Sequence, residues 1–242
     1  TNQQINLITN AFYSNFCGIN LDRITSGIHF ICLNARSEKV KGFNHKYTVY
    51  ILIRKTACVI SYAPKYKNFF EQLKEKQFEE ILKEVEKKFK IKKMQLMIFK
   101  QELIKNYGNA RIIYEQDFNS YETFFHSVHP TITSTEWLQE YFISKTKKEY
   151  FAGYFVNDLL VSVCDAPDMP YMEDKIQHTG IVTLPTERRK GYAKLTTALA
   201  THNLIEKGIC PNWECQLENY ASINLAKSIG YEKYGIVYIV EE

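Results

Sequence analysis

One stretch, from Ile181 to Ala193, constrains the fold of this chain more than any other. It begins as an apolar strand, passes through a turn of three basic residues ending at Gly191, and continues as a long helical pattern. The first backbone N–H groups of a helix have no partner in the helix and lie at the positive end of its dipole, so they bind anions. Gly191 lets the backbone approach a bulky anion closely. The stretch therefore predicts a strand–turn–helix unit that holds a pyrophosphate.

The alternative is an ordinary strand-to-helix turn whose first residues happen to be basic. Cations at a helix N-terminus oppose the dipole by roughly 0.3 to 1 kcal/mol each. A bound anion would remove that cost, which favours the anion site.

Composition places the chain among globular proteins. Its 242 residues are 45% hydrophobic and 24% charged, with ten Gly and six Pro, which excludes collagen-like, disordered and small disulfide-stapled classes. The net charge of +4 is too small to require a polyanionic partner for the whole molecule. Any basic site must therefore be local.

Cysteine spacing and hydropathy indicate the expected compartment. The six Cys residues form neither a C-x-x-C pair nor a zinc pattern, so buried reduced thiols are expected and no metal is. The longest apolar runs, Tyr47 to Ile53 and Ala57 to Tyr62, are far shorter than the roughly 20 residues of a membrane span. Thr1 to Thr9 shows no secretory pattern. A cytoplasmic protein with no membrane partner is expected.

The N-terminal half predicts a small sheet and one amphipathic helix. Strands are expected at 27–33, at 47–62 with a turn at 54–56, at 95–99 and at 110–114. Apolar residues recur at helical spacing between Tyr66 and Phe89. Lys and Glu alternate along that helix, which favours a solvated salt-bridged face over a nucleic-acid site at Lys87 to Lys93.

The C-terminal half predicts the order helix, three strands, helix, strand, helix, strand. Thr133 and Glu136 have the spacing of a helix N-cap, 150–156 and 159–164 form a hairpin around Asn157-Asp158, and 176–183 is a third strand. A helix over 189–207, a strand over 213–217, a helix over 221–228 and a strand over 235–240 follow. We expect an N-terminal α/β domain at 1–125 and a second domain at 126–242.

Two blocks of the C-terminal half resemble the GNAT acetyltransferase superfamily. Arg188, Gly191 and Ala193 match its R-x-x-G-x-A acetyl-CoA signature. Residues 211–231 are similar to its next block, a strand, then Asn219 and Ser222 as N-x-x-S, then a short helix ending in Gly-Tyr. The chain most resembles a bacterial subgroup with an extra N-terminal domain, and the likeness covers about 133–240.

The resemblance implies an α/β fold with a mixed sheet flanked by helices, and an N-acetyltransferase that moves an acetyl group from acetyl-CoA to an amine by direct attack on the thioester. The N-terminal half would be a smaller strand-plus-helix domain, even a degenerate copy of the same fold. The strand before the signature would splay from its neighbour, and an N–H of Val182 or Thr183 would stabilise the oxyanion. The cofactor-binding residues implied are Ile181, Val182, Thr183, Arg188, Arg189, Lys190, Gly191, Tyr192, Ala193, Asn219 and Ser222.

The chain departs from the family pattern where acid and base are expected. Gln177 stands where many members carry a Glu base, and Ala226 where many carry a Tyr acid. His178 and Glu218 are the first catalytic candidates, because their segments lead into the predicted cleft. Other titratable substitutes are Asp165, Asp168, Glu173, Glu214, Tyr220 and Tyr231. The absent pair also permits a degenerate CoA-binding or interaction module.

The acceptor is expected to be a small molecule. The loop from Asp165 to Glu173 is acidic, carries an aromatic residue and two Met, and lies between two strands. It favours a cationic amine as acceptor, although a rigid Pro-containing connection explains the same residues equally well. The sequence does not predict an oligomeric state.

Overall fold

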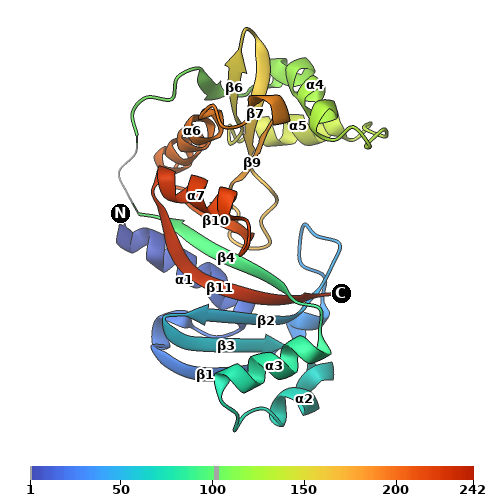
Figure 1. Cartoon of the computed structure of the whole chain (residues 1–242), viewed down its shortest axis with the longest axis vertical. Coiled ribbons are helices and arrows are strands. Elements are labelled where there is room, and N and C mark those ends of the chain that lie inside the picture. The colour runs from blue at the N-terminus through green and yellow to red at the C-terminus, as the bar shows by residue number, and fades with distance from the viewer. Residues whose placement is uncertain (1, 101–103) are drawn as a thin grey trace.

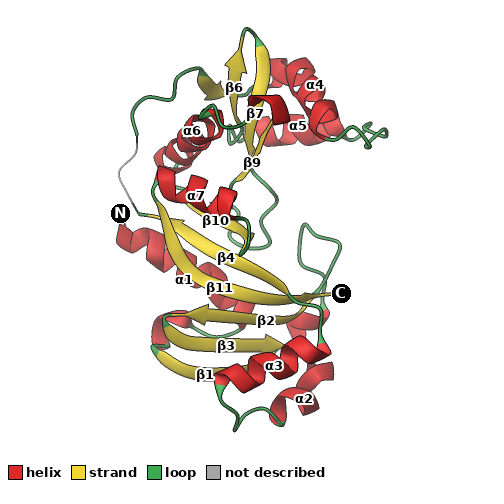
Figure 2. Ribbon diagram, in the orientation of Figure 1, coloured by secondary structure: helices red, strands yellow, loops and turns green. Residues whose placement is uncertain are grey.

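The structure, a computed structural model, describes residues 2–100 and 104–242, which form one seven-stranded and one four-stranded sheet with helices on their faces (Figures 1 and 2). The strands are β1 (Ser26–Cys32), β2 (Tyr47–Arg54), β3 (Thr56–Tyr62), β4 (Lys92–Phe99), β5 (Ala110–Ile112), β6 (Ala152–Val156), β7 (Leu159–Asp165), β8 (Ile176–His178), β9 (Gly180–Thr183), β10 (Cys210–Gln216) and β11 (Tyr231–Glu241). The α-helices are α1 (Asn2–Cys17), α2 (Lys67–Glu71), α3 (Phe78–Lys88), α4 (Phe118–Val128), α5 (Leu138–Thr146), α6 (Tyr192–Glu206) and α7 (Tyr220–Ile229). The expected mixed sheet flanked by helices is confirmed.

The larger sheet combines strands from both halves of the chain. Its order is β1-β3-β2-β11-β4-β10-β8, so β4 of the N-terminal half lies between β10 and β11 of the C-terminal half. Both of its neighbours pair with β4 antiparallel. The smaller sheet has the order β5-β6-β7-β9. The sheet that carries β10 is therefore completed by a strand from the first 100 residues.

A division of the chain at 125/126 falls inside α4. Tyr121, Phe124 and Phe125 of this helix share a hydrophobic cluster with Phe142 and Phe151 further along the chain. The two-domain division and the degenerate-copy reading of the first half stay predictions. The helix itself, which the sequence analysis did not predict, belongs by its packing to the small sheet.

The two faces of the larger sheet have separate cores because side chains alternate along each strand. Tyr50, Leu96 and Val237 face α1, together with Phe12 and Phe16 of that helix. On the opposite face α2 and α3 cover β2 and β3, and α7 covers Met97 of β4 and Trp213 of β10. We call the first of these the α1 face.

Many local predictions are confirmed. The strands at 47–62 turn at Lys55, whose φ is +53°. Asn157 and Asp158 form the hairpin turn with φ of +47° and +63°, as a tight type I′ loop requires. Gly230 caps α7 with φ of +118°.

Three local predictions are wrong. The helix expected over 66–89 breaks into α2 and α3, since the intervening 72–77 is mostly polar. The helix at Thr133 begins only at Leu138, with no side-chain cap. The buried residues of α6 are mainly small ones such as Thr197, Ala198 and Ala200, because α6 packs closely against strands of both sheets.

Candidate active site

A fork between two strands creates the candidate site. The strand expected over 176–183 is divided: β8 pairs with β10, whereas β9 pairs with β7 in the other sheet. The last link is the N–H of Thr179, which donates to the carbonyl of Asn212 at 3.2 Å. Beyond Thr179 the strands β9 and β10 separate. The splay expected before the signature is thus present in the structure.

The register of β9 determines which of its backbone groups face the open side of the fork. Leu184 N–H donates to the carbonyl of Val161 at 2.9 Å, and Val182 lies opposite Val163. Because N–H groups alternate in direction along a strand, Val182 N–H points toward β7 and Thr183 N–H points away from it. Of the two oxyanion donors expected, only Thr183 faces the fork; Ile181 faces it in the same way.

The N-terminus of α6 adjoins this open edge. Gly191, its N-cap residue, has φ of +86°, and no side chain caps the first N–H groups of the helix. A Cβ at Gly191 would have no atom within 4 Å, so the glycine borders open space. Arg188 Nε donates to the carbonyl of Thr183 at 3.3 Å, which ties the basic turn to β9. These groups form the unpaired donor set that a pyrophosphate requires.

One cavity of about 650 Å³ brings the predicted cofactor residues together. They come from β9, the basic turn, the first turn of α6 and the start of α7. The lining includes Ile181, Val182, Thr183, Arg188, Arg189, Gly191, Tyr192, Ala193, Asn219 and Ser222. Lys190 is the one predicted residue outside the lining, and its ammonium pairs with Glu187 at 2.9 Å. The volume lies in the usual range for small-molecule sites.

Asn219 and Ser222 also hold the wall of this cavity in place. Asn219 caps α7 by accepting a hydrogen bond at Oδ1 from Ser222 N–H, at 3.1 Å. Trp213 Nε1–H of β10 donates to Ser222 Oγ at 3.0 Å. The N-x-x-S spacing therefore joins the start of α7 to β10.

The two positions where the family usually carries acid and base are buried and structural. Gln177 is 4% exposed, and its amide donates to the carbonyls of Pro167 and His178. Ala226 is fully buried against β4 and β10. Neither position carries a titratable side chain.

His178 lies at the apex of the fork, beside Glu214 and not beside Glu218. The distance between His178 Nδ1 and Glu214 Oε2 is 3.7 Å, and about a fifth of each side chain is exposed. Burial lowers the pKa of His178 to about 4 and raises that of Glu214 to about 7, since a low-dielectric site disfavours the charged form of either group. His178 is therefore neutral at pH 7, and Glu214 is poised to gain or lose a proton.

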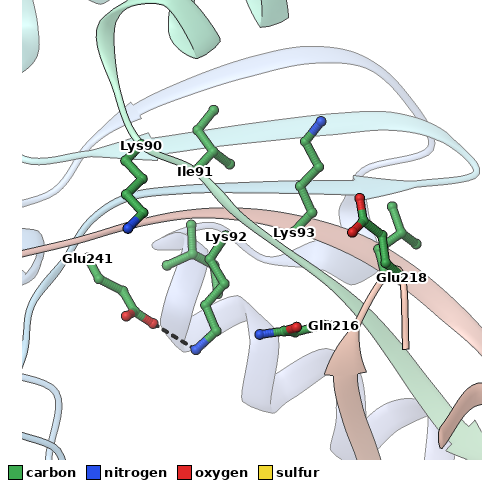
Figure 3. Close-up of a pocket in the computed structure, with 9 residues that line it drawn as sticks. Lys90, Ile91, Lys92, Lys93, Gln216, Glu218 and Glu241 are labelled. Atoms are coloured by element: carbon green, nitrogen blue, oxygen red, sulfur yellow. Dashed lines mark hydrogen bonds and ion pairs between the residues drawn. The ribbon is translucent and has the colours of Figure 1, made fainter. Parts of the chain in front are cut away.

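Glu218, the second catalytic candidate, lines a different cavity. Figure 3 shows it beside Lys93 in a groove of about 580 Å³ at the ends of β4, β10 and β11. The structure does not place Glu218 with His178. Glu214 carried a sequence signal of its own, an acid between Trp213 and Cys215 in an otherwise apolar strand.

The remaining titratable candidates have other partners. The Tyr231 hydroxyl shares a hydrogen bond with Thr201, and the Tyr220 side chain is largely exposed. The acidic loop is neutralised locally, because Asp168 pairs with Lys145 and Glu173 pairs with Lys41 at 3.8 Å. Asp165 is buried, which raises its pKa, and nearby Lys145 opposes that effect. The loop presents little free negative charge to a cationic acceptor.

Two findings concern what the described residues do not contain. Between residues 2–100 and 104–242, no helix has the length and apolarity needed to cross a bilayer. In the same ranges, no three His, Cys, Asp or Glu side chains gather as metal ligands would.

Comparison with known proteins supplies the family. Residues 131–237 match the family model described as GNAT acetyltransferase. No curated protein sequence matches the chain. The matched segment contains β9, α6, β10 and α7, the elements that enclose the 650 Å³ cavity.

Solved structures agree with this family at the level of the fold. The chain is similar to a GNAT-family acetyltransferase from Colwellia psychrerythraea, with 14% identity and a TM-score of 0.52 over 63% of this chain and 57% of that one. It is also similar to a GCN5-related N-acetyltransferase from Sphaerobacter thermophilus, with 13% identity and a TM-score of 0.52 over 67% of this chain and 55% of the other. The chain thus spans less than two thirds of the length of either protein. The forked strands, the uncapped helix and the matched segment together place this chain in the GNAT superfamily of acyltransferases.

Proposed function

We propose that this protein transfers an acetyl group from acetyl-CoA to the amine of a small molecule. The observation that carries the proposal is the single cavity at the fork, which gathers all the signature residues except Lys190. Its open strand edge, uncapped helix N-terminus and adjoining arginines are what a thioester on a pyrophosphate-bearing arm needs.

In this proposal the pyrophosphate lies against the first turn of α6. The N–H groups after Gly191 donate to its oxygens, and Arg188 and Arg189 supply positive charge. The pantetheine arm lies along β9, where Ile181 and Thr183 turn their backbone groups away from β7. The thioester is thereby directed to the apex near Thr179.

At the apex the amine nitrogen attacks the thioester carbonyl carbon. An N–C bond forms, the C–S bond breaks, the amine loses a proton and the CoA thiolate takes one up. Thr183 N–H stabilises the oxyanion, an effect worth roughly 3 to 4 kcal/mol per donor in other enzymes. Glu214 lies on β10 two residues beyond the last link at Asn212, on the side of the sheet opposite α7. We assign it the role of base, in place of Glu218.

His178 acts through Glu214. Its Nδ1 lies 3.7 Å from the carboxylate, and as a neutral ring it donates or accepts one hydrogen bond there. We assign His178 a positioning role: it orients the carboxylate toward the fork.

Calorimetry and thiol release test the proposal in two steps. Acetyl-CoA binding is measured for wild type, Gly191→Ala and Gly191→Glu, because both variants share the unfavourable φ and only the second adds bulk and negative charge. Binding should survive in Gly191→Ala and fail in Gly191→Glu. Equal binding by all three proteins would refute the phosphate site.

The second step separates the enzyme from a CoA-binding module without chemistry. CoA thiol is assayed with a panel of small amines, for wild type and Glu214→Gln. A degenerate module binds acetyl-CoA and releases no thiol with any amine. Release by wild type that Glu214→Gln retains in full would remove Glu214 from the reaction.

A further inference from the structure

Buried polar atoms without partners gather on the α1 face of the large sheet. Within the described residues, seven buried side-chain N or O atoms have no hydrogen-bond partner in the protein. Five belong to the α1 face and its surroundings: Tyr13 Oη, Arg36 Nη2, His45 Nε2, His178 Nε2 and Asn212 Oδ1. An unsatisfied buried polar group costs about 1 to 3 kcal/mol. Their concentration in one region indicates a polar ligand that satisfies them together.

Arg36 is the most costly of these groups, because it is a buried cation. Its side chain is 5% exposed, and its guanidinium carbon lies 5.0 Å from the ring centroid of Tyr50 and 5.8 Å from that of Phe16. Nε donates to Ser61 Oγ at 3.0 Å and Nη1 to the carbonyl of Tyr47 at 3.4 Å. No carboxylate among the described residues pairs with it. A buried guanidinium with a free N–H fork is suited to a carboxylate ligand.

Arg36 and Glu214 face the same group of phenols. The charge of Glu214 raises the pKa of Tyr47 and of Tyr50, while the charge of Arg36 lowers both. Tyr13 is also under the influence of Glu214. Aromatic rings connect the two ends without a break, since Phe16 contacts Tyr171 at 5.0 Å, and Phe12 contacts both Tyr171 and His178.

The groove of Figure 3 reaches this region from the surface. Gln216 follows Glu214 by two residues on β10, so both side chains lie on the α1 face. Lys92 and Glu241, paired at 3.1 Å, line the groove and both act on the Glu214 carboxyl. Glu241 lies opposite Tyr47 on the neighbouring strand. The groove therefore runs from Glu214 toward Tyr47, to whose carbonyl Arg36 donates (Figure 3).

From this geometry we infer that the acceptor is an amino carboxylate, whose amine lies at Glu214 and His178 and whose carboxylate is held by Arg36. This inference rests on the proposed acetyl transfer. It replaces the cationic acceptor expected from the acidic loop, because the loop acids Asp168 and Glu173 are neutralised by lysines, whereas the arginine on this face has no acid.

The strand order sets the length of such an acceptor. Glu214 stands on β10 and Tyr47 on β2, with β11 and β4 between them. Three strand spacings amount to about 14 Å, and the side chains of Glu214 and Arg36 extend into that width. The remaining gap accommodates a chain of several carbon atoms, as in 6-aminohexanoate, and is too wide for an α-amino acid as short as glycine.

Matched amines test the inference. CoA thiol release is measured with 6-aminohexanoate, with hexylamine, which has the same chain length and no carboxylate, and with glycine. Wild type should prefer 6-aminohexanoate over hexylamine by tenfold or more in kcat/KM, and over glycine as well. In Arg36→Met the preference over hexylamine should fall to about one, and Arg36→Lys should restore part of it.

A matched control separates this role from general packing. Arg54 also lies over a tyrosine, 4.6 Å from the ring centroid of Tyr234, but outside the groove and the fork. Arg54→Met should keep the preference of wild type. Melting curves verify that each variant is folded, and Arg36→Lys keeps the test usable if Arg36→Met is not.

The outcomes separate this inference from the proposed function. Release from every amine at rates that ignore the carboxylate, in wild type and Arg36→Met alike, overturns the inference and leaves acetyl transfer standing. A preference lost in Lys92→Met and kept in Arg36→Met overturns it too, since the carboxylate would then lie in the groove. If no amine releases thiol, acetyl transfer fails, and calorimetry of 6-aminohexanoate with CoA present judges the site: weaker binding by Arg36→Met supports it, and equal binding refutes it.

Discussion

Replacing Glu214 by Gln should change how the stability of the protein depends on pH. The pKa of Glu214 is about 7 in the folded protein against 4.5 for the free side chain, mainly because the carboxylate is desolvated. A carboxyl whose folded pKa is raised stabilises the fold while protonated, and this contribution is lost as the pH rises toward 7. The full loss is about 3 kcal/mol, at 1.36 kcal/mol per pKa unit.

Most of this loss falls within an accessible pH range. Linkage with these two pKa values gives a loss of about 2.5 kcal/mol in the free energy of unfolding between pH 5 and pH 8. His178 adds the opposite dependence, because its pKa is lowered by burial to about 4 and its contribution is lost as the pH falls from 6.5. The variant retains His178, so the difference between variant and wild type isolates Glu214.

Urea unfolding at pH 5 and pH 8 measures the effect. From pH 5 to pH 8, Glu214→Gln should gain about 2.5 kcal/mol in free energy of unfolding relative to wild type. A difference between the two proteins that stays constant over this range would show that Glu214 is ionised in the folded state throughout. The pKa reasoning, and with it the assignment of a base poised near neutrality, would then be wrong.

Three further outcomes follow from the same site. The rate of acetyl transfer in wild type should fall as the pH drops below about 7, because the base becomes protonated, and Glu214→Gln should lose this limb of the pH–rate profile together with roughly 10² to 10⁴ in kcat. Ala226→Tyr should lower the melting temperature rather than raise turnover, since Ala226 is fully buried in a packed cluster and overpacking costs about 1 to 3 kcal/mol; an unchanged melting curve would mean that the cluster has room for a phenol. Gln177→Glu should destabilise the protein at pH 8 more than at pH 5, because an ionised carboxylate would face the carbonyls of Pro167 and His178; urea unfolding at both values checks this, and equal losses would contradict it.

Gly191 illustrates how far local sequence reaches. A glycine after three basic residues at the start of a helix specifies an anion nest from chain-local geometry alone. The structure confirms a left-handed Gly191 with open space at its Cβ. Hairpin turns and the α7 cap were predictable for the same reason, since each depends on residues adjacent in the chain.

The helices α1 and α4 escaped prediction because their stability comes from packing rather than from a local pattern. Phe12 and Phe16 of α1 are buried by aromatic residues of β2 and of the loop near Tyr171. The helix over 66–89 was predicted as continuous from its periodicity, which does not register that a polar interval can leave the helical path.

The catalytic pair depended on pairing between distant strands. His178 and Glu214 are 36 residues apart in the sequence and meet because β8 and β10 are parallel neighbours whose pairing ends at Thr179. Glu218 is nearer to the family motif along the chain, but past the end of β10 it lines the groove and not the fork. Spacing along the chain cannot distinguish these two acids, whereas strand register can.

Arg36 shows the same limit over a longer range. In the sequence it is one arginine in a polar stretch of the N-terminal half, with no motif around it. It comes to act beside Glu214 because β4 and β11 insert between β10 and β2 and join the two halves in one sheet. Its burial without an acid partner arises from that long-range assembly, since local sequence sets backbone conformation but not which distant side chains will surround a charge.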